Sequence, residues 1–255
     1  MNKKQFSKEA GWLLQEKYQG RLTKAAKKDI ARLKAGEPVD YLIGFVEFAG
    51  CKIDLSSKPL IPRPETEHWI LLAIEEIKKY RSSPKRDLSI RCLDMFSGSG
   101  CIGIAVLKHI LQARVDFAEN EKKFLQQIQL NLKKNRISKK RFRVFQSDIF
   151  SDISGEYDYI FANPPYIAES KKHSVQASVL KHEPHEALFA GKDGLKYIKK
   201  FLREARKHLL PGGKIYMEFD SPQKREIDKL LKKFGYLHWQ FYKDQYGKWR
   251  FVVIT

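Results

Sequence analysis

The run Asn163-Pro164-Pro165-Tyr166 contains the residue types that most directly suggest chemistry. An –NH2 group attached to a carbonyl or to a ring is a poor nucleophile, because its lone pair is delocalised. The side-chain oxygen of Asn163 and the carbonyl of Pro164 can each accept one hydrogen of such a group, which fixes its plane and directs its lone pair towards an electrophile. Tyr166 can stack on the planar group and interact favourably with a nearby cation.

The alternative is that these four residues form an ordinary polyproline-type loop, since two prolines stiffen the backbone and remove two donors. The run follows the predicted strand 157–162, and open α/β sheets bind ligands at the carboxyl ends of their strands. That position favours the chemical interpretation. We assign no general base among His173, His182 and His185, because the proton on the nitrogen can leave to solvent once the new bond begins to form. No metal site is predicted around His182, since Pro184 prevents a regular helical pair with His185.

A second candidate site is the loop after the predicted strand 90–94, where Gly98 and Gly100 let the backbone approach a ligand closely. Asp94 precedes this turn, as suits a cationic ligand such as the aminoacyl part of S-adenosylmethionine. Glu119 ends the next predicted strand, where its carboxylate can accept hydrogen bonds from both ribose hydroxyls. The loop and the acidic residue together predict S-adenosyl-L-methionine as the cofactor. The residues expected to contact the cofactor are Asp94, Phe96, Ser97, Gly98, Ser99, Gly100, Glu119, Asp148, Ile149 and Asn163.

Some of these assignments have alternatives. A glycine loop alone can be a structural tight turn, and a Rossmann dehydrogenase would need a third glycine placed for a pyrophosphate. Asp116 is a second acidic residue near Glu119, but it lies in the middle of its strand. Asp148 can bind the adenine amino group, with Ile149 packed on the ring, or it can cap a turn. The sequence leaves these two roles of Asp148 open.

Alternating apolar runs and amphipathic stretches must position these residues. Such alternation predicts βαβ units and a mostly parallel sheet covered on both faces. The last two strands are joined by a turn that contains Gly247 and should pair antiparallel, which is the arrangement of class I S-adenosylmethionine-dependent methyltransferases. We therefore predict an α/β fold with a Rossmann-like seven-stranded sheet whose last strand is antiparallel. The expected strands are 90–94, 114–119, 142–146, 157–162, 214–219, 237–241 and 249–254, and the expected helices are 101–111, 121–135, 194–209 and 222–234.

The sequence divides into three predicted parts. Residues 1–37 form a short basic helical segment with ten Lys or Arg and three acidic residues before a turn at 35–38. Residues 38–87 contain a β-hairpin (44–48 and 51–55) and a linker helix that starts near Pro64 and runs to about Tyr80. The polar stretch 81–87 is a break, and residues 88–255 form the methyltransferase domain.

The composition restricts the class of protein but says little about its chemistry. Of 255 residues, 49 are Lys or Arg and 30 are Asp or Glu, which gives a formal net charge of +19. No apolar run approaches the roughly 20 residues of a membrane span, and three scattered cysteines favour a reducing cytosol. We therefore expect a cytoplasmic protein. The charge, with seven Lys or Arg between 133 and 143, makes nucleic acid a candidate partner, although a charge run is more often a solvated face.

Several short sequence motifs resemble those of a known protein family. Residues 41–44 (Tyr-Leu-Ile-Gly), 60–67 (Leu-Ile-Pro-Arg-Pro-Glu-Thr-Glu) and 183–188 (Glu-Pro-His-Glu-Ala-Leu), together with both candidate sites, resemble the peptide chain release factor glutamine methyltransferases, the HemK/PrmC family. The likeness covers roughly residues 38–254. Asn-Pro-Pro-Tyr is shared with DNA and RNA amino-methyltransferases, whereas the string at 60–67 is far more specific. The resemblance implies N5-methylation of the glutamine in the Gly-Gly-Gln motif of release factors, with a release factor as protein partner.

Carried over by position, the resemblance implies a catalytic clamp of Asn163, Pro164 and Tyr166 and a substrate side that also includes Pro165, Arg63 and Glu183. Phe96 stands where the family usually has glycine, so we expect a slightly different backbone path there. Glu119 replaces the usual aspartate and keeps the carboxylate. The N-terminal helical part, which in the family contacts the release factor, is short here. We expect a monomer.

Two other functions remain open. One is amino-methylation of a DNA or RNA base at adenine N6, cytosine N4 or guanine N2, which the charge of +19 supports. Against it, nothing in the sequence argues for the roomy aromatic pocket that a flipped base needs. The other is a non-catalytic adapter that binds RNA or ribosomes. The intact run 163–166 argues against the adapter, because a binding module has no need of it.

Overall fold

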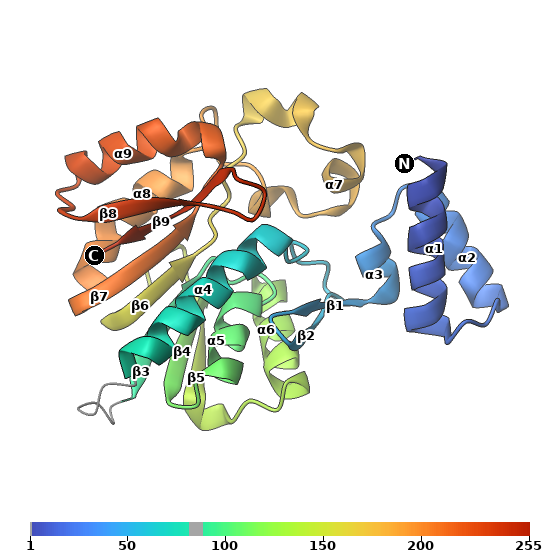
Figure 1. Ribbon diagram of the computed structural model, residues 1–255, viewed down its shortest axis with the longest axis horizontal. Helices are drawn as coiled ribbons and strands as arrows, with labels where there is room; N and C mark the ends of the chain where they lie inside the picture. Colours follow the sequence, from blue (N-terminus) through green and yellow to red (C-terminus); the bar gives the residue numbers. More distant parts are fainter. Residues whose placement is uncertain (1, 82–88) are drawn as a thin grey trace.

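The centre of the molecule is a seven-stranded sheet in the order β5-β4-β3-β6-β7-β9-β8, shown in Figure 1. The computed structural model describes residues 2–81 and 89–255. Strands β3 to β7 run parallel, and β9 is antiparallel to both β7 and β8. This confirms the predicted fold class. The strands are β3 (Ile90–Met95), β4 (Ala113–Glu119), β5 (Phe142–Gln146), β6 (Tyr157–Ala162), β7 (Leu209–Glu218), β8 (Trp239–Lys243) and β9 (Trp249–Ile254).

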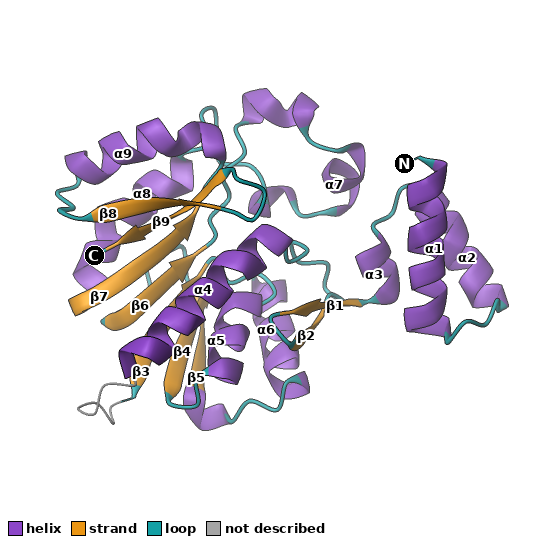
Figure 2. Cartoon of the chain, in the orientation of Figure 1, coloured by secondary structure: helices purple, strands orange, loops and turns teal. Residues whose placement is uncertain are grey.

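Helices cover both faces of the sheet (Figure 2). Side chains that alternate along a strand point to opposite faces, so Cys92 joins the core under α4, α5 and α6, while Leu93 joins the core under α8 and α9. The two cores are therefore separated by the sheet itself, as in a doubly wound fold. These helices are α4 (Pro64–Arg81), α5 (Cys101–His109), α6 (Lys122–Lys134), α8 (Lys196–Glu204) and α9 (Lys224–Lys233).

Strand β7 begins five residues earlier than predicted, at Leu209. Its pairing with β6 is irregular between Tyr157 and Tyr159, where the register shifts. The glycines at 212 and 213 lie inside this irregular part, as is common for glycines within strands. Between β6 and α8, the chain forms the short helix α7 (Ala177–His182) and two 3₁₀ turns, at Glu169–Ser174 and His185–Ala187, none of which was predicted.

Three N-terminal helices form a small unit beside the sheet, at the right of Figure 1. They are α1 (Lys3–Tyr18), α2 (Lys24–Lys34) and α3 (Val39–Ile43). Leu13, Leu33 and Leu42 form its apolar centre. Asp29 is buried between the helices, where its carboxylate accepts hydrogen bonds from Lys17, Tyr18 and Arg32. This core continues through α3, past the boundary expected at residue 37.

A hairpin of β1 (Phe45–Phe48) and β2 (Cys51–Asp54) joins this unit to the sheet domain, as predicted. The carboxylate of Asp54 accepts hydrogen bonds from Gln127 and Lys134 of α6, and its backbone N–H donates to the side chain of Asn131. The predicted break at 81–87 and the boundary after residue 87 lie largely outside the described residues. No helix in the described part of the chain is long and apolar enough to cross a membrane.

Candidate active site

Two hollows meet at the carboxyl edge of the sheet. The first, called the main cavity, lies over the ends of β3, β4, β5 and β6 and is lined by Phe96, Glu119, Ile149 and Asn163 among others. The second, called the side groove, runs between Pro164, Tyr166 and α7. Asn163 lines both. The site lies where the strand order reverses beside β3, which is where open α/β sheets bind their ligands.

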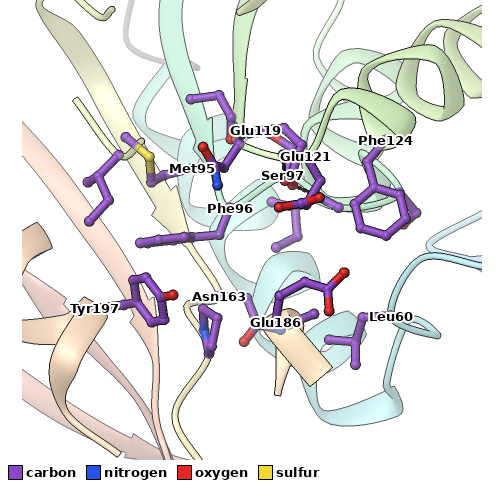
Figure 3. Close-up of a pocket in the computed structure, with 18 of the residues that line it drawn as sticks. Leu60, Met95, Phe96, Ser97, Glu119, Glu121, Phe124, Asn163, Glu186 and Tyr197 are labelled. Carbon is purple, nitrogen blue, oxygen red and sulfur yellow. Dashed lines mark hydrogen bonds between the residues drawn. The ribbon is translucent and has the colours of Figure 1, made fainter. Parts of the chain in front are cut away.

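Most residues predicted to contact the cofactor line the main cavity, including Ser97, Gly98, Ser99 and Asp148. Figure 3 shows Glu119 and Asn163 on opposite sides of Phe96. Glu119 is 8% exposed and accepts hydrogen bonds from the N–H groups of Gly98 and Glu121, at 2.7 and 2.8 Å. Burial raises the pKa of Glu119 against the lowering effect of these hydrogen bonds.

The alternative acidic residue, Asp116, does not line the main cavity. Its carboxylate accepts hydrogen bonds from Arg143 and Tyr157 at 2.6 to 2.9 Å. The geometry therefore favours Glu119 as the residue that faces a ligand.

Asp94 and Gly100 lie beneath the cavity, not on its wall. Asp94 is fully buried, and its Oδ2 atom accepts a hydrogen bond from the N–H of Gly103, in the first turn of α5. Its Oδ1 atom has no hydrogen-bond partner among the described residues. Burial raises the pKa of Asp94 well above the usual range. An unpartnered buried acceptor is costly, so a donor supplied by a ligand would stabilise this part of the fold.

Phe96 and Ile149 both hold a φ of 60°, in the left-handed region that bulky L residues rarely adopt. Both residues line the main cavity. Strained residues of this kind persist where the surrounding structure determines them, and they cluster at functional sites. At Phe96, where we expected a slightly different backbone path from that of the family, the phenylalanine takes a conformation that glycine adopts without strain. Its ring packs against Tyr197 and Phe201, with centroids 6.2 and 6.1 Å away.

The side chain of Asp148 is not used as a turn cap. Its carboxylate lies 3.4 Å from the Nζ atom of Lys200, and the turn after β5 is instead closed by the hydroxyls of Ser147 and Ser151. The structure therefore contradicts the role of Asp148 as a turn cap. Its side chain remains available on the wall of the main cavity.

The run 163–166 divides between the two hollows. Asn163 and Pro165 line the main cavity, while Asn163, Pro164 and Tyr166 line the side groove. The Nδ2 atom of Asn163 donates to the hydroxyl of Thr66 at 3.2 Å. Its Oδ1 atom accepts no hydrogen bond from the described residues and can accept one from a ligand. The hydroxyl of Tyr166 donates to Glu218 at 3.1 Å, so the rigid loop is attached to the neighbouring strand β7.

Arg63 and Glu183, both expected on the substrate side, bind each other. The Nη2 atom of Arg63 donates to Glu183 at 2.6 Å, and the N–H of Ile61 donates to the same carboxylate at 3.2 Å. Arg63 lines both hollows. Glu183 is 4% exposed and lines neither, so its expected contact with substrate is not what the structure shows. A buried carboxylate needs a cation or donors, and here it holds the segment 61–63 over the site.

Sequence reasoning missed several residues of the site. Thr66 and Tyr197 line the main cavity, and Glu218 lies 1% exposed beneath it. Glu218 did carry a signal, because an acidic residue in an otherwise apolar strand is rarely buried without a partner. Tyr197 carried none, since its place on the wall depends on how α8 packs. No cluster of three or more His, Cys, Asp or Glu in the described residues is arranged to hold a metal ion.

The cavity fits a ligand with a ribose and a cationic end. Glu119 offers a carboxylate at the end of β4, and the loop 96–100 offers backbone groups close to the ligand. Beneath this loop, the Oδ1 atom of Asp94 is a buried acceptor that receives no hydrogen bond from the described residues. These features agree with S-adenosylmethionine, whose ribose and ammonium group need such acceptors.

The comparisons with known proteins agree with this site. Residues 82–194 match the family model of the methyltransferase small domain. The chain is 33% identical over 226 residues to the release factor glutamine methyltransferase of Streptococcus pneumoniae, covering 88% of this chain and 76% of that protein. It is 31% identical over 244 residues to that of Lactococcus lactis, covering 95% and 86%.

A solved structure extends the likeness to the fold. The 16S rRNA N2 G1207 methyltransferase of Thermus thermophilus, in complex with AdoMet and guanosine, superposes with a TM-score of 0.56 at 17% identity, covering 82% of this chain and 49% of that one. Identity this low supports the shared methyltransferase fold only. The resemblance noted in the sequence is confirmed by the close relatives: the chain belongs to the release factor glutamine methyltransferase family.

Proposed function

We propose that this protein transfers a methyl group from S-adenosyl-L-methionine to the side-chain amide nitrogen, N5, of the glutamine in the Gly-Gly-Gln motif of peptide chain release factors. The observation that carries the proposal is that Asn163 lies where the main cavity meets the side groove. A cofactor in the cavity and a glutamine side chain in the groove would then approach each other at Asn163. Family membership supports the same substrate.

On the cofactor side, the carboxylate of Glu119 accepts hydrogen bonds from the ribose hydroxyls. Asp148 and Ile149 contact the adenine. The loop 96–100 follows the aminoacyl part. Bound there, the cofactor supplies an electrophilic methyl group on a cationic sulfur. Because Glu119 is nearly buried, its hydrogen bonds to the ribose form away from bulk water and are strengthened accordingly.

On the substrate side, the Oδ1 atom of Asn163 and the carbonyl of Pro164 accept the two hydrogens of the glutamine amide. This fixes the amide plane and directs the nitrogen lone pair towards the cavity. The ring of Tyr166, held through its hydroxyl by Glu218, forms the wall of the groove on which the planar amide stacks. The surplus proton leaves to solvent, so the scheme needs no general base.

The basic surface is proposed to assist docking. Lys139 and Lys140 are exposed beside β5, and the exposed faces of α1 and α2 carry further lysines. Not all of the run 133–143 is free, because Arg141 donates to the backbone carbonyls of Leu107, Ile110 and Ala113. The remaining charge suits an acidic protein surface or weak contact with ribosomal RNA. We propose that the enzyme acts in the cytoplasm as a monomer.

Labelled methyl transfer tests the substrate assignment. Purified release factor, the same factor with its motif glutamine replaced by glutamate, total RNA and DNA would each be incubated with the enzyme and methyl-labelled S-adenosylmethionine. We expect label in the release factor alone, and none after the glutamine is replaced. Label in the glutamate variant would overturn the site of transfer, and label in nucleic acid with none in the release factor would support the base methyltransferase instead.

A further inference from the structure

A buried carboxylate that the sequence analysis did not single out binds several side chains around Asn163. Glu218, at the end of β7, accepts three side-chain hydrogen bonds: from Thr66 at 2.7 Å, from Trp69 at 2.8 Å and from Tyr166 at 3.1 Å. Burial raises the pKa of Glu218, against the opposing effect of these hydrogen bonds and of Arg250. The Oε2 atom of Glu218 accepts both from the indole N–H of Trp69, which can only donate, and from the hydroxyl of Thr66.

The first turn of α4 brings these groups together. Thr66 and Trp69 are three residues apart and therefore lie on the same face of the helix, which packs over the ends of β6 and β7. Both side chains reach the same oxygen of Glu218. Thr66 is 2% exposed, so no bulk water competes for its hydroxyl.

The hydroxyl of Thr66 has a single hydrogen, and that hydrogen is donated to Glu218. Only lone pairs remain to face Asn163, so Thr66 can accept from Asn163 but cannot donate to it. The side-chain amide of Asn163 must therefore turn its NH2 group towards Thr66, as the 3.2 Å contact has it. Its Oδ1 atom is then the end presented at the junction of the two hollows.

We propose that Thr66 and Glu218 form a positioning pair that fixes the orientation of the Asn163 amide and so makes the site select a hydrogen-donating carboxamide over an acceptor-only carboxylate. The proposal rests on the proposed function, because it concerns the glutamine that enters the groove. A substrate glutamate would place its oxygens against the Oδ1 atom of Asn163, with no hydrogen between them. Sites built to pair with a donor reject analogues that lack it, because their own polar atoms are left unpaired.

Removing the hydroxyl of Thr66 while keeping its shape tests the proposal. In Thr66→Val, the amide of Asn163 is free to turn by 180° and offer its NH2 group instead. We expect kcat on the release factor to fall about tenfold, which is the size of one lost hydrogen bond. The release factor with glutamate in its motif should at the same time become a relatively better inhibitor, so that its Ki divided by the KM of the normal factor falls about tenfold.

Thr66→Ser is the matched control, because it keeps the hydroxyl. It should retain a kcat and a Ki/KM ratio close to those of the wild type. Cofactor affinity from calorimetry should be similar in the two variants. The unfolding midpoint should be lower in Thr66→Val, because the hydroxyl that donates to buried Glu218 is lost. A purely structural loss of this kind would leave the Ki/KM ratio unchanged. Equal kcat and equal Ki/KM in Thr66→Val and Thr66→Ser would overturn the proposal.

A second measurement needs no substrate and separates this inference from the proposed function. The Nδ2 protons of Asn163 can be followed by NMR in the full-length protein, and their signals can be assigned by their loss in Asn163→Ala. One proton should be protected from solvent exchange in the wild type and in Thr66→Ser, and unprotected in Thr66→Val. Unchanged protection in Thr66→Val would refute the positioning pair, whereas a wild-type enzyme that fails to methylate release factor would refute only the substrate.

Discussion

At the scale of single residues, Phe96 combines an unfavourable backbone with a place on the cavity wall. A left-handed φ costs an L residue about 1–2 kcal/mol, so contacts elsewhere in the fold must compensate for that cost. What holds Phe96 in place is its ring, which packs against Tyr197 and Phe201 of α8. The packing therefore links the cofactor loop to the helix on the far wall of the cavity.

The strain can be measured by comparing Phe96→Gly with Phe96→Ala. Both variants lose the ring, but only alanine keeps the steric cost of φ 60°. We expect the glycine variant to have the larger free energy of unfolding by roughly 0.5–1 kcal/mol, measured by urea denaturation. The same pair at Phe145, within strand β5, is the control and should show the opposite order. An alanine variant at 96 that is the more stable would show that the backbone is not strained there.

Functional residues could be predicted from the sequence where the residue type and its place at the end of a strand were enough to locate it. Asn163 and Glu119 end apolar strands, and the ends of parallel strands share one edge, so type and position sufficed to place both on the main cavity. Thr66 and Glu218 are 152 positions apart in the sequence, and their meeting depends on how α4 packs over the sheet. Arg63 and Glu183 were singled out for the substrate, but their pairing with each other is likewise a long-range contact.

At the scale of elements, the hairpin β1–β2 is held to α6 by a few polar contacts at Asp54. Burial raises the pKa of Asp54, but hydrogen bonds from Lys134, Ser56 and Gln127 outweigh it and bring the pKa to about 2. The pKa of the folded protein is thus below that of an unfolded aspartate, near 3.9. Ionised Asp54 therefore stabilises the fold above about pH 4, and this contribution is lost as the pH falls towards 2.

We expect Asp54→Asn to lower the free energy of unfolding by about 1–2 kcal/mol at pH 6, after allowance for solvent screening. At pH 2 to 2.5, the difference from the wild type should shrink, because the wild-type carboxyl is itself partly protonated. Denaturant titrations across this pH range provide the measurement. Asp152→Asn, on the exposed turn after β5, controls for the loss of a charge. A difference that is the same at both pH values would contradict the assignment.

Gly194 packs closely against the loop 163–166, next to the carbonyl group of Tyr166. Its φ is 72°, and a Cβ there would collide with the carbonyl oxygen of Tyr166 and lie 2.8 Å from the side-chain nitrogen of Gln223. Gln223 itself donates to that same carbonyl at 2.9 Å. A side chain at 194 would therefore push Tyr166 out of place.

Gly194→Ala should lower methyl transfer by more than tenfold and lower the free energy of unfolding by about 2–4 kcal/mol, combining overpacking with left-handed strain. Gly212→Ala is a matched control, because its φ is 77° and no atom lies within 4 Å of the added Cβ. The control should lose only about 1–2 kcal/mol and keep its activity. Equal effects of the two substitutions would show that contact with Tyr166 is unimportant.

Strands and helices with a clear period were predicted nearly to the residue, as β5, β6 and β9 show. The apolar runs of β6 and β9 follow from burial, whereas β5, at the edge of the sheet, is only partly buried and mixes apolar with polar residues. The stretch 167–195 was not predicted, because its α7 and 3₁₀ turns are short and depend on contacts such as the bridge between Ile167 and Phe189. This is also the stretch that forms much of the side groove.

At the scale of the whole molecule, three separate parts build one junction. The linker segment supplies Arg63 and Thr66, the sheet supplies Asn163 and Glu218, and the stretch 175–188 closes the groove. The net charge of +19 is spread over the molecule: exposed lysines lie on the N-terminal helices and beside β5, and Arg63, Lys196 and Lys200 line the main cavity. We therefore propose that the surface charge serves docking and that Asn163 serves the chemistry.

The most direct test of this account measures turnover and cofactor affinity together in Asn163→Ala. Removing the group that accepts the substrate hydrogens should lower kcat for release factor methylation by about 10²–10³-fold, as for the loss of one preorganised polar contact to a reacting group. The dissociation constant of S-adenosylmethionine, from calorimetry, should stay within about threefold of the wild type, since Glu119 and the loop 96–100 are untouched. A variant that methylates release factor at nearly the wild-type rate would contradict the central role of Asn163.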